Sequence, residues 1–448
     1  MAIWNKDKQL YNTNNSVQFE AMVLASENGV TIDDNNPLPV SVSTLGNSDA
    51  FGRSRISEPY TLGDYKHVYG LDPNFLDVAV NGGTSTFQAN KACARLATTS
   101  NSSSRLVHQT KMYHHYMPGK SQLIMSSFCF YTATANVVKR TGYFDDANGI
   151  YFQQDGSGVL SMVVRSSTSG SPVEDIKTQS QWNVDKCDGT GPSGFNIDIS
   201  KTQLWWCDFQ WLGVGRVRLG FVHDGKLVIC HCFYHSNVLN TVYLSNPNLP
   251  VRCEIKNVGT TTGAYMDQIC STVISEGGYV ESGIDHSIQN PSLRSLAVGA
   301  TLPVIAIRLK NTFNTYSNRI TVRAGNVFVF SSGSNVLWKL MKLSGNAALN
   351  TGAWSDVNTG VSAVEYNITA TGTPSGDIID GGYVSANTQN PQKVAAGSMT
   401  PNTPSASKKN FISQNYDSTD SEIYVLVATN IGADATTVGA SMQWREIL

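Results

Sequence analysis

Short runs of alternating residues joined by tight turns constrain the fold of this chain more than any other feature. Two such runs, 216–222 and 226–235, are separated by Asp224 and Gly225. An Asp-Gly pair readily takes the positive φ angles of a type I′ turn, which connects adjacent antiparallel strands. This stretch therefore predicts a β-hairpin.

Similar patterns recur along most of the chain. Two more turns of the same kind are predicted within residues 144–162, at Asn148-Gly149 and Asp155-Gly156. Other runs rich in β-branched residues and bounded by Gly, Asn, Asp or Ser also predict strands, and they span 122–133, 158–167, 301–310, 319–332, 336–343, 421–430 and 436–448. Helical periodicity is weak: only 72–80 and 85–99 suggest short helices, and the second also fits the approach to a strand.

These patterns predict an all-β fold in three parts. Residues 1–50 form an extended N-terminal arm, 51–285 a jelly-roll-like β-sandwich, and 286–448 a C-terminal β-sandwich domain. The Gly- and Ser-rich stretch 275–300 separates the two sandwiches. Residues 386–419, which are rich in Asn, Ser, Thr and Pro, are expected to form a long exposed loop.

The predicted arm contains a short β-prone segment framed by prolines, with Pro37, Leu38, Pro39 and Val40 in succession. Because proline cannot donate to a strand ladder, this segment is excluded from the centre of a sheet. It gains stability only by docking on something else, and a neighbouring subunit is the natural candidate. We therefore expect an assembly role for these four residues.

Composition narrows the class of protein. Only 15% of the residues are charged, against about 25% in typical soluble domains, so the polar surface comes mainly from Ser, Thr, Asn and Gln. The formal net charge of −2 suggests no electrostatic binding of nucleic acid or anionic membranes. There is no apolar run of membrane-spanning length and no signal-like apolar segment at the start, so we expect synthesis in a cytoplasm and no membrane insertion.

Cysteine and histidine are concentrated in residues 230–235, which raises the question of a metal site. Structural zinc sites use Cys-x2–4-Cys pairs on tight turns, whereas Cys230 and Cys232 lie one residue apart in a predicted strand. Strict alternation would place both sulfurs on one face and His231 on the other. We expect apolar sulfur in a sandwich core. A four-sulfur cluster with Cys207 and Cys253, or a disulfide, remains an alternative.

Other candidate sites are weaker. His114 and His115 are adjacent, so on a strand they face opposite ways and do not easily chelate one metal. Asp145 and Asp146 could bind an isolated calcium ion, but a solvated turn is the simpler interpretation. The sequence therefore predicts no metal and no cofactor. Paired carboxylates for glycoside hydrolysis cannot be located from spacing alone, and we expect no enzymatic activity.

Aromatic residues near the central hairpin offer one further hypothesis. Exposed Trp and Tyr side chains on a jelly-roll face can stack on sugar rings, which makes Trp205, Trp211 and Tyr234 candidate glycan contacts. The alternative is a core position, since aromatic side chains dominate buried surface. We expect two of the three tryptophans 205, 206 and 211 to be buried.

The segment 191–255 resembles one that recurs in virion structural proteins of tailed bacteriophages, particularly marine and cyanobacterial ones. Its most specific part is FQWLGVGRVRLGF, residues 209–221. The stretches WNKDKQLYNTNNSVQFE, NNPLPV, ISEGGY and LPVIAIRLK resemble the same proteins. Residues beyond about 345 show no such resemblance.

The resemblance implies a virion component at a tail, baseplate, neck or head-fibre position, with no catalytic motif. Such a protein would assemble with copies of itself, as a homotrimer or ring, and with other virion proteins. The alternative function is a glycan-binding module on the particle surface that adheres to the host.

Overall fold

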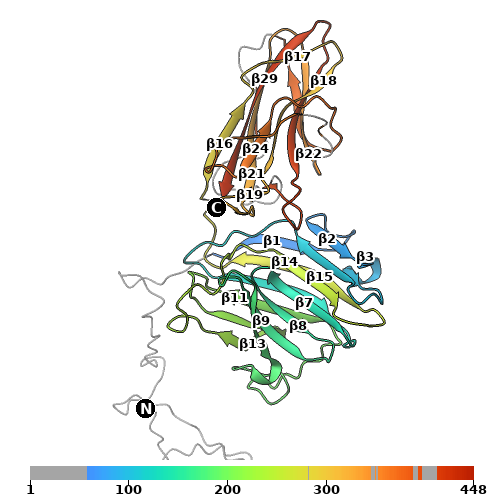
Figure 1. Ribbon diagram of the computed structural model, residues 1–448, viewed down its shortest axis with the longest axis vertical. Coiled ribbons are helices and arrows are strands. Elements are labelled where there is room, and N and C mark those ends of the chain that lie inside the picture. Colours follow the sequence, from blue (N-terminus) through green and yellow to red (C-terminus); the bar gives the residue numbers. More distant parts are fainter. Residues whose placement is uncertain are drawn as a thin grey trace, which may run out of the picture. The chain divides into compact units, whose positions relative to one another are not determined.

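The computed structural model describes residues 58–280, 282–344, 349, 352–386, 392–395 and 411–447 (Figure 1). Its regular elements are antiparallel strands, apart from single 3-10 turns at Ala89–Lys91 and Gln179–Gln181. The predicted all-β fold is thus confirmed. The predicted assembly residues Pro37, Leu38, Pro39 and Val40 lie outside the described residues.

The first sandwich, drawn from blue to yellow-green in Figure 1, contains an eight-stranded and a seven-stranded sheet. The eight-stranded sheet has the order β13-β12-β11-β6-β15-β4-β3, and β1 also pairs with β15. Its strands are β1 (Tyr60–Lys66), β3 (Thr84–Gln88), β4 (Cys93–Ala97), β6 (Gln122–Cys129), β11 (Gln203–Phe209), β12 (Val217–His223), β13 (Lys226–Phe233) and β15 (Tyr265–Ser275).

The seven-stranded sheet has the order β10-β9-β8-β7-β14-β5-β2. Its strands are β2 (Phe75–Val80), β5 (Arg105–Thr110), β7 (Val137–Phe144), β8 (Gly149–Gln154), β9 (Leu160–Ser166), β10 (Val173–Thr178) and β14 (Val251–Asn257). The two sheets share one apolar core. On β11, for example, the alternate residues Trp205, Cys207 and Phe209 all belong to that core, as the period of two requires.

The second sandwich, drawn in yellow to red, contains two six-stranded sheets. One has the order β16-β29-β21-β26, with β17 on β29 and β27 on β21; the other has the order β23-β24-β18-β28-β22-β25. The first of these sheets comprises β16 (Ile284–Gln289), β17 (Arg294–Leu296), β21 (Thr321–Ser331), β26 (Gln392–Ala395), β27 (Phe411–Ile412) and β29 (Thr436–Ile447).

The other six-stranded sheet carries the candidate site described below. It comprises β18 (Thr301–Leu309), β22 (Val336–Leu343), β23 (Ser355–Asp356), β24 (Val364–Asn367), β25 (Asp377–Val384) and β28 (Ile423–Asn430). A separate hairpin pairs β19 (Thr312–Phe313) with β20 (Tyr316–Ser317). Trp338 from one sheet and Trp444 from the other lie in the core between them.

The strands expected from alternation are present, and 85–99 follows its strand alternative, whereas the short helix expected at 72–80 is absent. Residues 72–80 contain β2, and 85–99 contain β3, one 3-10 turn and β4, because pairing with β5 and β15 prevails over weak helical periodicity. The expected long loop includes β26 and β27. The expected boundary between residues 285 and 286 falls inside β16.

The Asp-Gly turn is as predicted, since φ is 49° at Asp224 and 73° at Gly225. The other two turns are not of this type. The Asp145 carboxylate accepts the backbone N–H groups of residues 147 and 148, and Asp155 does the same for 157 and 159. These side chains organise longer connections, so Asn148 needs no positive φ. None of the described helices is long and apolar enough to cross a membrane.

Candidate functional site

The strand that suggested a metal site contains a β-bulge. Leu219 pairs with His231 and Gly220 pairs with Ile229, so Cys230 is the extra residue on β13. A bulge changes which residues share a face. Cys230 therefore lies in the core with Phe233, whereas Cys232 lies outside that core cluster. The expectation that both sulfurs share one face was wrong.

The prediction of core sulfur holds for Cys207, Cys230 and Cys253, which belong to the core of the first sandwich. Burial raises the pKa of the Cys253 thiol to about 12, and that of Cys207 is also raised by burial. Both groups are therefore protonated at neutral pH. In the described part of the chain, no group of three or more His, Cys, Asp or Glu side chains is placed to hold a metal.

Two of the other candidate metal ligands, His114 and Asp146, have structural partners. His114 is fully buried, its Nε2 lies 2.7 Å from the Tyr65 hydroxyl, and burial lowers its pKa to about 4. It is therefore a neutral core histidine near pH 7. Asp146 Oδ1 lies 3.1 Å from Arg105 Nη2 and 2.8 Å from Arg252 Nη1. These partners account for both side chains without a metal.

The three candidate glycan residues do not form one surface. Trp205 is completely buried on the inner face of β11, so its assignment as a glycan contact was wrong. Trp206 is also buried, which confirms that two of the three tryptophans are inside. Trp211 is half-buried and donates from Nε1 to the Leu244 carbonyl at 3.0 Å. Tyr234 is 57% exposed.

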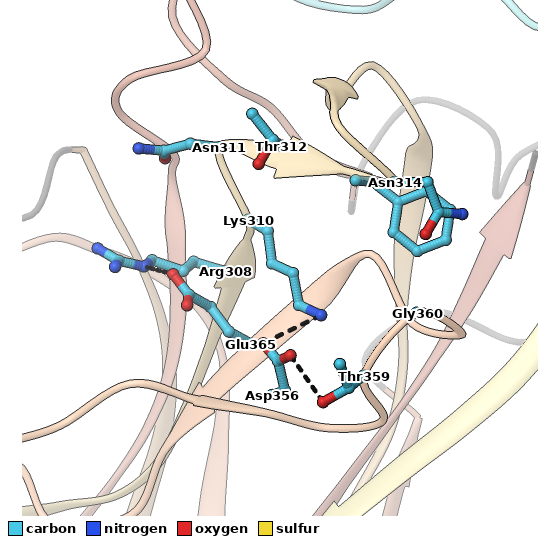
Figure 2. Close-up of a pocket in the computed structure, with 10 residues that line it drawn as sticks. Arg308, Lys310, Asn311, Thr312, Asn314, Asp356, Thr359, Gly360 and Glu365 are labelled. Carbon is cyan, nitrogen blue, oxygen red and sulfur yellow. Dashed lines mark hydrogen bonds and ion pairs between the residues drawn. The ribbon is translucent and has the colours of Figure 1, made fainter.

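A polar cavity in the second sandwich is the better candidate. Figure 2 shows it between the end of β18, the connection from β23 to β24, and the β19–β20 hairpin. Its volume is about 560 Å³. Its lining, called here the β18–β24 pocket, comprises Arg308, Lys310, Asn311, Thr312, Phe313, Asn314, Asp356, Thr359, Gly360 and Glu365.

Strand register explains why the charged residues of this pocket meet. Arg308 on β18 lies opposite Glu365 on β24, and Glu365 lies opposite Asp356 on β23. Cross-strand neighbours on one face of a sheet lie close enough to interact. Three strands distant in sequence thus place a cation and two carboxylates in one row.

Each charge in the pocket has an opposite partner (Figure 2). Arg308 Nε donates to Glu365 Oε1 at 2.5 Å, and Lys310 Nζ lies 3.1 Å from Asp356 Oδ1. Thr359 donates its hydroxyl to the other Asp356 oxygen at 3.0 Å. Hydrogen bonds from Lys310 and Thr359 hold the pKa of Asp356 below its usual value. The two cations and two carboxylates make the pocket formally neutral.

An aromatic ring completes the row. The Arg308 guanidinium lies over the Trp354 ring, with Cζ 4.1 Å from the ring centroid. Such a cation–π contact fixes the orientation of the guanidinium as well as contributing attraction. Arg308 is thus held from one side by a carboxylate and from another by an indole.

The β19–β20 hairpin forms the opposite wall. Asn314 and Thr315 at its tip have φ values of 48° and 72°, which is the pattern of a type I′ turn. The buried Asn318 amide donates to the carbonyls of Lys310 at 3.0 Å and Ala363 at 2.9 Å. One side chain therefore ties the base of the hairpin to β18 and to the segment before β24.

The sequence analysis missed this pocket. Its charged residues are spread between positions 308 and 365 and become neighbours only through β18–β24 and β23–β24 pairing. The available signal was the alternation Arg308-x-Lys310 and Trp354-x-Asp356, which places each pair on one strand face. That pattern alone does not reveal which strands pair.

Comparison with known proteins assigns no family. No protein-family model matches the chain, and no curated protein matches it. A β-1,3-glucanase from Mycobacterium marinum is 12% identical, with a TM-score of 0.33 over 48% of this chain and 99% of that one. A Bacteroides ovatus mixed-linkage glucan GH16 protein, in complex with a product, is 9% identical, with a TM-score of 0.33 over 47% and 99%.

A protein of unknown function from Shewanella oneidensis MR-1 is 9% identical, with a TM-score of 0.32 over 51% of this chain and 92% of that one. Identities and scores this low transfer no activity to the chain.

Proposed function

We propose that this chain is a structural subunit of a tailed-bacteriophage particle whose β18–β24 pocket binds glycan on the host surface without cleaving it. The virion assignment is supported by the resemblance of residues 191–255 to virion structural proteins, and by the low proportion of charged residues. The observation that carries the glycan assignment is the pocket itself. Its charges are balanced, and it offers both hydrogen-bond donors and acceptors.

A sugar suits the chemistry of this lining. Sugar hydroxyls both donate and accept, and the carboxylates of Asp356 and Glu365 provide acceptors beside the donors of Arg308 and Lys310. The Asn311 amide adds one group of each kind. Because the charges are paired, an uncharged ligand can enter without leaving a cation or carboxylate unbalanced.

The same geometry argues for binding rather than hydrolysis. A glycosidase requires one carboxyl group that stays protonated to serve as the general acid, which means a raised pKa. In this pocket, the pKa of Asp356 is lowered instead by Lys310 and Thr359. Glu365 already accepts a hydrogen bond from Arg308. Neither carboxylate has the surroundings of a proton donor.

A glycan array probed with the full-length protein tests the binding assignment, followed by calorimetry on the sugars that bind. Asp356→Asn should weaken binding about tenfold, because it removes a charged acceptor and the partner of Lys310. Asp377→Asn changes an exposed aspartate on β25 and is the matched control. Equal affinities for the two variants, or no binding at high micromolar concentration, would contradict the assignment. New reducing ends in the reaction mixture would reveal hydrolysis.

The assembly proposal has its own test. We expect the full-length protein to form a homotrimer or larger ring, and to contact other virion proteins. Light scattering after size exclusion measures the mass, and deletion of residues 1–45 should reduce assembly while circular dichroism shows the sandwiches still folded. A strictly monomeric full-length chain, absent from purified particles by mass spectrometry, would refute this proposal.

A further inference from the structure

A second polar cluster lies on the outer face of the first sandwich, remote in sequence from the β18–β24 pocket. Asp267 on β15 lies opposite Arg95 on β4. Their strand neighbours Met266 and Leu96 belong to the core, so alternation places Arg95 and Asp267 on the other face of the sheet. Lys91, Arg95, Tyr131, Tyr265 and Asp267 are called here the Arg95 cluster.

A buried carboxylate forms the base of this cluster. The Asp267 side chain is only 3% exposed. It accepts hydrogen bonds from Arg95 Nε at 2.7 Å, Arg95 Nη2 at 2.8 Å and the Tyr131 hydroxyl at 2.6 Å. Burial raises the pKa of Asp267, but these hydrogen bonds outweigh it and the pKa lies below the usual value. Asp267 is therefore a fixed negative charge that orients both partners.

The backbone at Tyr131 supports a positioning role for this residue. Its φ is 59°, in the left-handed region that costs free energy for any residue with a β-carbon. Such conformations persist where the surroundings fix them, and they are frequent at binding sites. In this protein the unusual backbone brings the Tyr131 hydroxyl onto Asp267 and its ring to 4.9 Å from that of Tyr265.

The outward side of the cluster offers cations and an aromatic ring. The Arg95 guanidinium lies 4.3 Å from the Tyr265 ring centroid, and Tyr265 is 43% exposed. Lys91 is 54% exposed, with Nζ 3.3 Å from the Tyr131 oxygen. Asp267 engages Nε and Nη2 of Arg95, while none of the described residues accepts a hydrogen bond from Nη1. Two cations share one carboxylate, which leaves a formal charge of +1.

We infer that the Arg95 cluster binds the carboxylate of an acidic sugar residue. The carboxylate accepts hydrogen bonds from Arg95 Nη1 and Lys91 Nζ, and the sugar ring stacks on the exposed Tyr265 ring. Guanidinium groups suit planar carboxylates, and charge-assisted bonds of this kind are the stronger ones. This inference rests on the proposed glycan-binding function and assigns a charged sugar class to a second place on the protein.

The two sites differ in net charge, which makes their ligands distinguishable. The β18–β24 pocket balances two cations with two carboxylates, whereas the Arg95 cluster has one cation in excess. A neutral oligosaccharide should therefore depend on Asp356, and an acidic one on Lys91 and Tyr265. The acidic ligand should also lose affinity as salt increases, because the cationic groups of Lys91 and Arg95 are partly exposed to solvent and salt screens their charges.

Calorimetry on the full-length protein tests this with trigalacturonate and with the neutral galactose trisaccharide of the same linkage. We expect trigalacturonate to bind about tenfold more tightly at low salt. Lys91→Gln and Tyr265→Ser should each weaken trigalacturonate binding several-fold. Neither change should unfold the chain, because the side chains of Lys91 and Tyr265 are both about half exposed to solvent. Lys226→Gln, an exposed lysine on β13 of the same sheet, is the matched control.

The outcomes separate this inference from the proposed function. If both trisaccharides bind equally, or if Lys91→Gln behaves like Lys226→Gln, the Arg95 cluster is not an acidic-sugar site, whatever Asp356→Asn does. If trigalacturonate binding depends on Lys91 while Asp356→Asn affects no glycan, the cluster stands and the pocket assignment fails. If trigalacturonate does not bind, the inference is overturned.

Discussion

Arg308 lies directly opposite Glu365 in the antiparallel pairing of β18 with β24, and its Nε is 2.5 Å from Glu365 Oε1. Both side chains are mostly shielded from solvent, so this ion pair differs from the common exposed kind. Arg308 also covers the Trp354 ring. The pair is therefore both a wall of the pocket and a support for the sheet.

Replacing this arginine should destabilise the protein. Arg308→Ala removes the cation–π contact with Trp354 and leaves the mostly shielded Glu365 carboxylate without its donor. We expect a loss of about 1–2 kcal/mol in the free energy of unfolding. Urea denaturation measures the difference. Arg216→Ala, at an exposed arginine, should change stability by less than about 0.5 kcal/mol. If the two variants are equally stable, the Arg308 contacts contribute nothing measurable.

The bulged segment of β13 lies very close to Gly220 on the neighbouring strand β12. A β-carbon at Gly220 would lie 1.8 Å from the Val228 carbonyl oxygen. Gly220→Ala must therefore displace a strand or open the bulge, and we expect a loss of more than about 2 kcal/mol or failure to fold. Thermal melting tests this. In Gly333→Ala, the added carbon meets no atom closer than 3.7 Å, so its melting temperature should barely change.

Two adjacent buried tryptophans should respond differently to the same substitution. Trp206 Nε1 donates to the Phe221 carbonyl at 3.1 Å, whereas no described residue accepts a hydrogen bond from Trp205 Nε1. Both Trp→Phe changes lose volume, but Trp206→Phe also loses a buried hydrogen bond. It should therefore cost about 1 kcal/mol more than Trp205→Phe. Equal losses in denaturant unfolding would indicate that this bond is not formed in solution.

His114 should make stability depend on pH. Its pKa is lowered to about 4 in the folded protein because it is fully buried, against an ordinary value of 6.5. The unfolded chain therefore binds the proton first, and stability falls as pH decreases from 6.5 towards 4. This difference amounts to about 3 kcal/mol. His114→Gln should flatten that part of the profile, while a variant with the unchanged slope would contradict the assignment.

Local alternation was sufficient to predict most strands, because a half-buried strand repeats every two residues whatever its partner. It failed at Cys230, where one extra residue on β13 reverses the faces beyond it. Nothing in the sequence of β13 marks that bulge, since its cause includes the close approach of Gly220 on β12.

The candidate site could not be predicted from local sequence patterns, for a related reason. The neighbours of Glu365 are set by two strand pairings that join positions 308, 356 and 365. Trp205 was misassigned because tryptophan suits both a sugar-binding surface and a core. Only the register of β11 decides between them, and it places Trp205 inside.

The anchoring of the β19–β20 hairpin by Asn318 has a kinetic consequence. Its amide binds two carbonyls from separate segments, so the wall that carries Phe313 keeps its shape when no ligand is present. A preorganised wall loses little conformational entropy on association. Asn318→Ala should therefore slow association and weaken binding, because the freed hairpin would have to be ordered anew at each encounter.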